Sequence, residues 1–369
     1  MKNILIYILI FLWFNSCKEN STTVIKPKKC NLPPQYTDNN NAPLVTGHSP
    51  GQLSPDGRKL LFSIRGDVVK VLDLKTLEVK TIDFESKLPS NMKLFASGGA
   101  TVRWCPYDNN LVIASCGINV DTVGDGKNFV YGYQLVETTI DGSFLNIVTP
   151  KECGPAGAIT IPIYAWLPSS TKGNDKFLII HKSNNSWRPY SIYCPQSQTF
   201  ESPNFNQPNG AQFRGYTYDM NYSTWIGGDK NTTRYYIAVN NNFLELIFKE
   251  YNISTIGFGA ISPNRKKLGV GAVVQNSSIL DTNSRLAEIW IIDLEKYLQN
   301  PVSPVPIEKI INLKEKFCMF SPGPSSIFIS ESTLVVNMFK GGYKEGDSFQ
   351  YLYEIDLDGN LKRQLTFVP

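Results

Sequence analysis

The chain has 369 residues, of which 42% are hydrophobic and 18% are charged, a composition typical of a globular protein with a sizeable core. Its formal net charge is +4, and apart from the short stretch IKPKK near the start the positive residues are dispersed. This charge is too small and too dispersed to indicate a nucleic-acid-binding protein, so no nucleic-acid partner is expected.

The N-terminus predicts export. One lysine is followed by an apolar run from Ile4 to Phe14, which is too short to span a bilayer comfortably and is typical of a secretory signal peptide. Ser16 directly before Cys17 resembles the bacterial lipoprotein signal, in which this cysteine becomes lipidated. The resemblance implies that the mature chain begins at Cys17 and is held at a membrane by acyl chains, and Lys18 favours the outer membrane. An ordinary signal peptide that is cleaved elsewhere is the alternative.

Three segments follow from this reading. Residues 1–16 are the predicted lipoprotein signal peptide, and residues 17–45 are polar and rich in proline and asparagine, as expected of a flexible tether. Residues 46–369 form the predicted folded domain. The predicted location is the bacterial cell envelope, with a lipid anchor in the membrane, and both the periplasmic and the cell-surface side remain open.

A recurring pattern fills the folded domain. The stretch LSPDGRKLLFS from Leu53 to Ser63 combines a hydrophobic residue, Ser-Pro, a polar turn and an apolar run. Similar stretches are ISPNRKKLGVGAVV from Ile261 and FSPGPSSIFISES from Phe320. After the first copy, DVVKVLDL and EVKTI are also β-rich, so one copy holds four short strands within about forty residues.

Six copies can be aligned at a spacing of about fifty residues, which indicates an array of β-repeats. A recurrent proline suits the place where an inner strand ends and no further ladder donor is needed. This proline stands at Pro55, Pro106, Pro168, Pro263 and Pro322, with Gly227 near its place in the fourth copy.

Six such sheets around one axis would bury their faces and leave only short edges. We therefore predict an all-β fold, a six-bladed β-propeller of four-stranded antiparallel blades over residues 46–369. A set of sandwich domains is the alternative. Two ways of closing the ring are open: LKRQLTF completes the sixth blade directly, or PLVTG adds a strand to it.

Two stretches, LSPDGRKLLFS and YLYEIDLDGNLKRQLTF, resemble the repeat of TolB-type periplasmic propellers. In that repeat a Ser-Pro-Asp-Gly turn precedes a strand, and an Asp-Leu-Asp-Gly turn leads to a final Arg-Gln-Leu-Thr. The resemblance implies the propeller fold. TolB proteins also have an N-terminal domain before the propeller, where this chain has a short tether.

Few residues in the chain suggest chemistry. The only histidines are His48 and His181, which excludes a histidine-rich metal site, and no GxSxG nucleophile motif is present. No catalytic residue, metal site or cofactor is therefore predicted. Six cysteines follow Cys17, and both disulfides and free buried thiols are open. A bridge between Cys105 and Cys116 is not expected, because a tight turn would place Cys105 opposite Val112.

The segment from residue 184 to 226 is rich in aromatic and amide side chains, and the connection from Gln196 to Tyr218 has few strand signals. Long loops on a rigid scaffold are often functional. Aromatic rings with amides suit a protein partner or a sugar. The alternative is that these aromatics fill the gap between the third and fourth blades. The predicted binding face comprises Trp187, Arg188, Tyr190, Arg214, Tyr216 and Trp225.

The sequence thus favours a lipid-anchored envelope propeller that acts as a non-enzymatic scaffold for an envelope protein partner. The alternative is a propeller that binds or processes a glycan in an axial pocket. Processing would require two convergent carboxylates. Asp219 and Glu201 are candidates for this role, but their spacing does not mark them as a pair.

Overall fold

A computed structural model describes part of the folded domain. The described residues are 48–64, 68–84, 86–94, 102–118, 121–122, 128–129, 132–143, 145–148, 163–167, 169, 174–183, 186–204, 208, 211–219, 221–228, 233–248, 253–275, 285–301, 304–313, 326–339 and 350–366. The predicted signal peptide, the predicted tether and Cys17 lie outside them.

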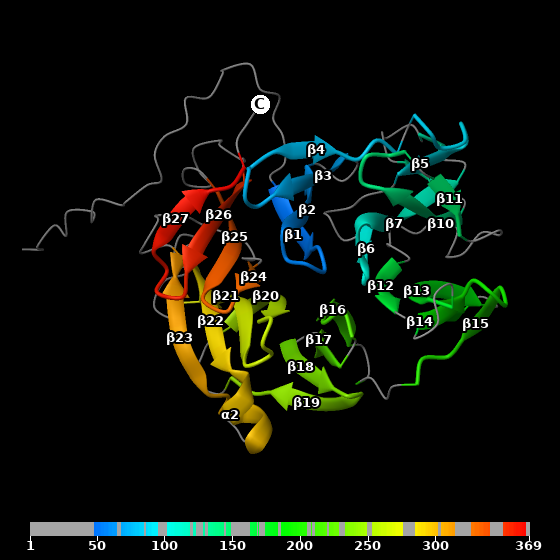
Figure 1. Cartoon of the computed structure of the whole chain (residues 1–369). Coiled ribbons are helices and arrows are strands. Elements are labelled where there is room, and N and C mark those ends of the chain that lie inside the picture. Colours follow the sequence, from blue (N-terminus) through cyan, green and yellow to red (C-terminus); the bar gives the residue numbers. More distant parts are fainter. Residues whose placement is uncertain are drawn as a thin grey trace, which may run out of the picture. The chain divides into compact units, whose positions relative to one another are not determined.

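Six antiparallel sheets surround a common axis, and each sheet is built from strands that follow one another in the chain (Figure 1). This arrangement confirms the prediction of a six-bladed β-propeller with four-stranded blades. The first strand of each blade lies nearest the axis. These strands are β1 (His48–Leu53), β6 (Val102–Cys105), β12 (Ile163–Leu167), β16 (Gln212–Tyr216), β20 (Ile253–Ile261) and β24 (Ser326–Ser330).

The remaining strands continue outward in sequence order. The second strands are β2 (Lys59–Ile64), β7 (Asp108–Ile118), β13 (Lys176–Ser183), β17 (Tyr222–Gly228), β21 (Lys267–Gln275) and β25 (Thr333–Phe339). The third strands are β3 (Val68–Asp73), β10 (Gly132–Thr139), β14 (Ser186–Cys194), β18 (Thr233–Val239), β22 (Arg285–Asp293) and β26 (Gln350–Asp356). The fourth strands are β4 (Val79–Thr81), β11 (Leu145–Ile147), β15 (Thr199–Glu201), β19 (Asn242–Leu246), β23 (Ile307–Asn312) and β27 (Leu361–Gln364).

Four elements add to this plan. In the second blade β5 (Met92–Leu94) pairs with β7 beside β6, and β8 (Asp121–Thr122) and β9 (Asn128–Phe129) form a separate pair. The short helix α2 (Leu294–Gln299) connects β22 to β23, and the Asp293 carboxylate caps it by accepting a hydrogen bond from the backbone N–H of Lys296. Among the residues that the model describes, no helix has the length and apolar composition needed to cross a bilayer.

The hydrophobic core is divided among the spaces between neighbouring blades. Alternate residues of a strand point to opposite faces, so Leu60 packs toward the sixth blade while Leu61 packs toward the second. Both faces of β2 are therefore buried. This explains why a strand such as KLLFSI appears in the sequence as a continuous apolar run and not as an alternating one. One buried cluster occupies each of the six interfaces.

The Ser-Pro-Asp-Gly motif forms the turn between the first and second strands. In blade one Ser54 Oγ donates to Asp56 Oδ1 (2.6 Å) and accepts from the backbone N–H of Lys59 (2.9 Å). Ser262 and Asn264 repeat this arrangement in blade five, since Ser262 Oγ lies 2.8 Å from Asn264 Oδ1. The motif is thus a self-contained turn whose hydroxyl and carboxylate or amide replace backbone hydrogen bonds.

The fourth and sixth copies differ from the sequence alignment. In blade four the equivalent turn is Thr217-Tyr218-Asp219, in which Thr217 Oγ1 donates to Asp219 Oδ1 (2.6 Å), whereas Gly227 lies within β17. In blade six the first strand, β24, follows Pro322 instead of preceding it. The connection from Gln196 to Tyr218 also contains two strands, β15 and β16. Both are short and carry few apolar residues, so their pattern did not distinguish them from a loop.

The C-terminal strand β27 pairs with β26 and completes blade six directly, as one of the two predicted closures required, whereas PLVTG lies outside the described residues. The contact with blade one is made by side chains, including Leu60, Phe62 and Leu365. Arg363 also bridges this seam, since its Nη2 donates to the carbonyl of Leu74 in blade one (2.7 Å) while its Nε pairs with Glu354 (2.6 Å).

Candidate functional site

The ring has two ends, which are distinguished by the strands that connect there. At one end, called here the turn end, the first strand of each blade connects to the second and the third connects to the fourth. Side chains there join neighbouring blades: Asp56 N–H donates to Asn109 Oδ1 (3.0 Å), Asn264 N–H to Glu331 Oε1 (2.6 Å), and the hydroxyl of Tyr107 to Asp175. At the other end, called the hairpin end, second strands lead into third strands, as β13 leads into β14.

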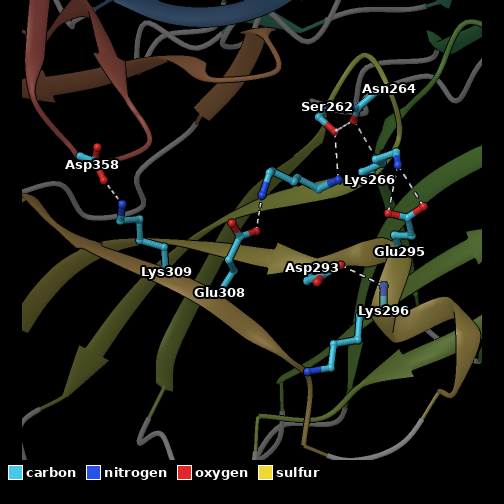
Figure 2. A network of polar contacts seen from close by, with 10 residues as sticks. Ser262, Asn264, Lys266, Asp293, Glu295, Lys296, Glu308, Lys309 and Asp358 are labelled. Atoms are coloured by element: carbon cyan, nitrogen blue, oxygen red, sulfur yellow. Dashed lines mark hydrogen bonds and ion pairs between the residues drawn. The ribbon is translucent and has the colours of Figure 1, made fainter.

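The turn end also carries a network of ion pairs around blade five (Figure 2). Lys266 pairs with Glu295 on α2 (3.1 Å), and Lys267 pairs with Glu308 on β23. Lys309 pairs with Asp358 of blade six. Arg265, which is the first residue of the run Arg265-Lys266-Lys267, pairs with Asp219 of blade four. The positive charge of this run is therefore balanced by three carboxylates: two of the pairs lie within blade five, and the pair Arg265–Asp219 links blade five to blade four.

Two members of the predicted binding face are buried between blades three and four. Tyr190 and Trp225 are 6% and 2% exposed, and their ring centroids lie 5.4 Å apart. Trp225 also makes an edge contact with Phe213 at 5.0 Å, and its Nε1 donates to Ser223 Oγ (2.8 Å). The hydroxyl of Tyr190 accepts from the backbone N–H of Phe213 (2.7 Å). Their contacts are those expected if the aromatics fill the gap between these blades.

Trp187 and Arg188 lie at the hairpin end of blade three. In the antiparallel register they stand opposite Lys182 and His181, next to the point where β13 turns into β14. The side chains of Trp187 and Arg188 are outside the described residues. That they bind a partner remains a prediction.

Arg214 and Tyr216 are half-buried on β16, the strand of blade four nearest the axis. The positive charge of Arg214 acts on the hydroxyl of Tyr235, but burial dominates there and raises the pKa of Tyr235. Tyr216 is at the turn end of its strand, whereas Trp187 and Arg188 are at the hairpin end of theirs. The six predicted residues are therefore divided among a core layer, the axis and the hairpin end.

A polar cluster that the sequence did not indicate lies at the axis. Gln52 Nε2 donates to the Tyr216 hydroxyl (3.1 Å), and Gln52 Oε1 accepts from the backbone N–H of Trp104 (3.0 Å). The Tyr218 hydroxyl donates to the carbonyl of Leu53. The rings of Tyr216 and Tyr218 contact each other edge to face at 6.3 Å. No local signal could have revealed this cluster, because Gln52 and Tyr216 are separated by 164 positions.

These two tyrosines are neutral hydrogen-bonding groups at physiological pH. Burial raises the pKa of Tyr216, and the nearby charge of Arg103 and the hydrogen bond from Gln52 offset this only in part. Burial also raises the pKa of Tyr218 well above its usual range. Both hydroxyls therefore remain protonated and act as positioning groups rather than as acids or bases.

The two candidate carboxylates do not converge. Asp219 accepts hydrogen bonds from Thr217 and Asn221 and pairs with Arg265, all on the turn end of blades four and five. Glu201 pairs with Lys176 (2.7 Å) within blade three. In the described part of the chain, no group of three or more His, Cys, Asp and Glu side chains could hold a metal ion.

Cys105, Cys116 and Cys194 are free and buried, so the expectation that Cys105 and Cys116 are not bridged is confirmed. The register differs by one residue, since Val112 stands opposite Trp104 and not Cys105. Burial raises the pKa of Cys105 to about 12, which keeps this thiol protonated and unreactive.

Comparison with solved structures finds remote similarities, at low sequence identity. TolB from Acinetobacter baumannii is 13% identical, with a TM-score of 0.44 over 85% of this chain and 62% of that one. An oligogalacturonate lyase from Vibrio parahaemolyticus is 10% identical, with a TM-score of 0.44 over 79% of this chain and 73% of that one. The β-propeller domain of the Trilobed protease from Pyrococcus furiosus is 10% identical, with a TM-score of 0.42 over 85% of this chain and 83% of that one.

The protein is thus a six-bladed β-propeller with remote structural similarity to TolB and other propellers, and it spans 62% of the length of that TolB chain. No family model matches the sequence, and no curated protein matches it. At these identities the likeness concerns the fold alone.

Acid titration of the turn end provides a test of the turn geometry. Burial by itself raises the pKa of Asp219, but hydrogen bonds from Thr217 and Asn221 and the charge of Arg265 outweigh it, so the pKa is lowered on folding. A carboxylate of this kind stabilises the fold above its unfolded pKa of about 3.9, and the contribution is lost as the pH falls through the lower folded value. We expect wild type to be more stable than Asp219→Asn by a constant margin above about pH 5 and by a vanishing margin at the lowest pH. Urea denaturation of both proteins from pH 7 downward measures this margin, and a margin that grows on acidification would contradict the assignment.

Proposed function

We propose that this chain is a lipid-anchored protein of the bacterial cell envelope whose propeller is a non-enzymatic scaffold for an envelope protein partner. The observation that carries the proposal is that side chains at the turn end link neighbouring blades. Side chains of the turn end are engaged in contacts between blades, as in the pairs Lys309–Asp358 and Arg265–Asp219. A rigid ring of this kind suits the presentation of a binding surface at its opposite end.

The hairpin end of blade three supplies the proposed contact. Trp187 and Arg188 are adjacent in β14 beside the hairpin. Tryptophan and arginine are the residue types that most often dominate protein interfaces, because each buries a large area and offers directional hydrogen bonds. The lipid on Cys17 and the tether up to residue 45 would hold this surface close to a membrane.

In-cell crosslinking in the native host, followed by affinity isolation from detergent-solubilised envelopes and mass spectrometry, tests the partner. We expect one reproducible envelope protein that is lost in the double variant Trp187→Ala/Arg188→Ala. The matched control is Lys75→Ala/Lys296→Ala, two exposed residues of the turn end, which should retain the partner. Equal recovery from both variants, or no partner from wild type, would overturn the proposal.

The lipid anchor is tested separately. Metabolic labelling with an alkyne-bearing fatty acid should label the wild-type protein and not Cys17→Ser. An unlabelled wild-type protein that is cleaved at another position would indicate an ordinary signal peptide.

Glycan binding at the axis is the second candidate, and the axial cluster favours it. The half-buried rings of Tyr216 and Tyr218 and the amide of Gln52 are the kinds of group that stack on and hydrogen-bond to sugars. Cleavage of a glycan is disfavoured, because Asp219 and Glu201 are engaged in separate ion pairs on different blades. A glycan panel in which Tyr216→Ala loses binding that Trp187→Ala retains would support this candidate over the first.

A further inference from the structure

The seam between blades six and one is held together by contacts of side chains. Blade one is built from β1 to β4 and blade six from β24 to β27, so among the described strands none is exchanged between the first and last blades. The seam therefore depends on the apolar cluster around Phe62 and Leu352 and on the bridge from Arg363 to the Leu74 carbonyl. The first attachment of blade one is therefore to its two neighbours, since β1 packs against the strands of blade six and Trp104 of blade two donates from Nε1 to the Gln52 carbonyl (3.0 Å).

A second attachment of blade one comes from the opposite side of the ring. Blades one and four are three places apart in a ring of six, and β1 and β16 both lie near its centre (Figure 1). From blade four the Tyr216 hydroxyl accepts from Gln52 of β1, and the Tyr218 hydroxyl donates to the carbonyl of Leu53. Tyr218 also packs against the apolar cluster shared by blades one and two. Two tyrosines that are separated by one residue thus reach two neighbouring residues of β1, Gln52 and Leu53.

The divergence of the fourth copy from the repeat accounts for these contacts. Tyr218 occupies the place of Pro55 and Pro263 in the equivalent turns, so a long aromatic side chain replaces a short cyclic one at the position next to the axis. The register of β16 also shifts between Phe213 and Gly215, and this shift brings the Phe213 and Tyr216 rings to 5.6 Å from each other. The copy that fits the repeat least well is the one that reaches across the ring.

We propose that Tyr216 and Tyr218 form a cross-axis brace that holds blade one in the ring, in addition to its contacts with blades two and six, and that fills the axial space at the turn end. A ligand or partner segment that enters the axis would then do so from the hairpin end. The proposal is independent of the identity of any partner, and its test requires none.

Native-state hydrogen exchange of the whole folded chain, followed by mass spectrometry of peptides, tests the brace. Tyr218→Phe removes the hydroxyl that bonds the Leu53 carbonyl and keeps the ring in place. Because one such bond contributes about 1 kcal/mol, we expect exchange in β1 to become about fivefold faster, with blade three unchanged. Tyr222→Phe is the matched control, since Tyr222 is also half-buried in blade four but faces Arg265 away from this cluster. Equal protection of β1 in both variants would overturn the proposal.

Chemical rescue tests whether the Tyr218 ring fills the axial space. Tyr218→Ala should have a lower melting temperature, and p-cresol, which has the shape of the missing side chain, should raise it by several degrees. Neither wild type nor Tyr222→Ala should respond to p-cresol. A Tyr218→Ala protein that melts like wild type would contradict the brace, and if this variant does not fold, the exchange measurement on Tyr218→Phe decides.

Discussion

Replacing Gly259 by alanine is expected to destabilise the protein by about 3 kcal/mol, because the new methyl group has no space. A Cβ at this position in β20 would overlap the hydroxyl oxygen of Tyr235, which reaches from blade four beneath the strand. It would also lie 3.3 Å from a methyl of Leu268. Tyr235 is fully buried in the interface between blades four and five and cannot move aside without disturbing that core. Urea denaturation of the variant measures the loss.

The matched control is the removal of the opposing hydroxyl. Tyr235→Phe removes the contacts of this hydroxyl with Thr224 and with the backbone of Gly259, and alone it should change stability by about 1 kcal/mol. In Tyr235→Phe/Gly259→Ala the nearest atom to the new methyl becomes the ring Cζ at 3.0 Å, and most of the lost stability should return. A double variant as unstable as Gly259→Ala alone would show that the cost has another origin.

The second large effect is expected at Trp225, where truncation should cost stability and not only binding. Its side chain is almost fully buried and contacts Tyr190, Phe213 and Phe243 with ring centroids 5.0–5.4 Å apart. We expect Trp225→Ala to lower the free energy of unfolding by about 3–5 kcal/mol, as is usual for a buried tryptophan. Chemical denaturation gives the value.

Trp225→Phe is the matched control for this prediction. It keeps an aromatic ring in the layer and loses the hydrogen bond from Nε1 to Ser223, so its cost should be about 1–2 kcal/mol. Trp187→Ala, at the hairpin end, should by contrast affect partner recovery in the crosslinking experiment. If the Trp225→Ala protein has wild-type stability but loses a partner, Trp225 belongs to the binding surface and not to the core.

Repetition in the sequence was sufficient to predict the blades. Runs such as KLLFSI in β2 and AEIWIID in β22 are apolar on both faces, which predicts strands covered on both sides. The Ser-x-Asp turn at Ser54 recurs as Ser-x-Asn at Ser262, and its hydrogen bonds involve residues within five positions of each other. Signals of this kind are local, so they can be recognised without knowing the rest of the fold.

The fourth blade was harder to predict, for an equally physical reason. β16, with the sequence QFRGY, contains an arginine and a glycine and has no continuous apolar run like that of β2. A Cβ on Gly215 would lie 2.9 Å from the carbonyl oxygen of Gly259, so this glycine permits the close approach of two blades. The reason for a glycine at position 215 is its contact with Gly259, which is 44 positions away. No pattern within the segment itself indicates that contact.

The sequence by itself thus determined the all-β class, the number of blades and most of the strand pairs, because these follow from local turn chemistry and from the spacing of apolar residues. The tertiary structure alone decided that β27 completes blade six, that Tyr190 and Trp225 lie in a core layer, and that Tyr216 and Tyr218 meet Gln52 and Leu53 at the axis. Each of these depends on contacts between residues that are remote in the chain. Such contacts exist only once the blades have packed around the axis, and the residues that make them have no distinguishing pattern before that.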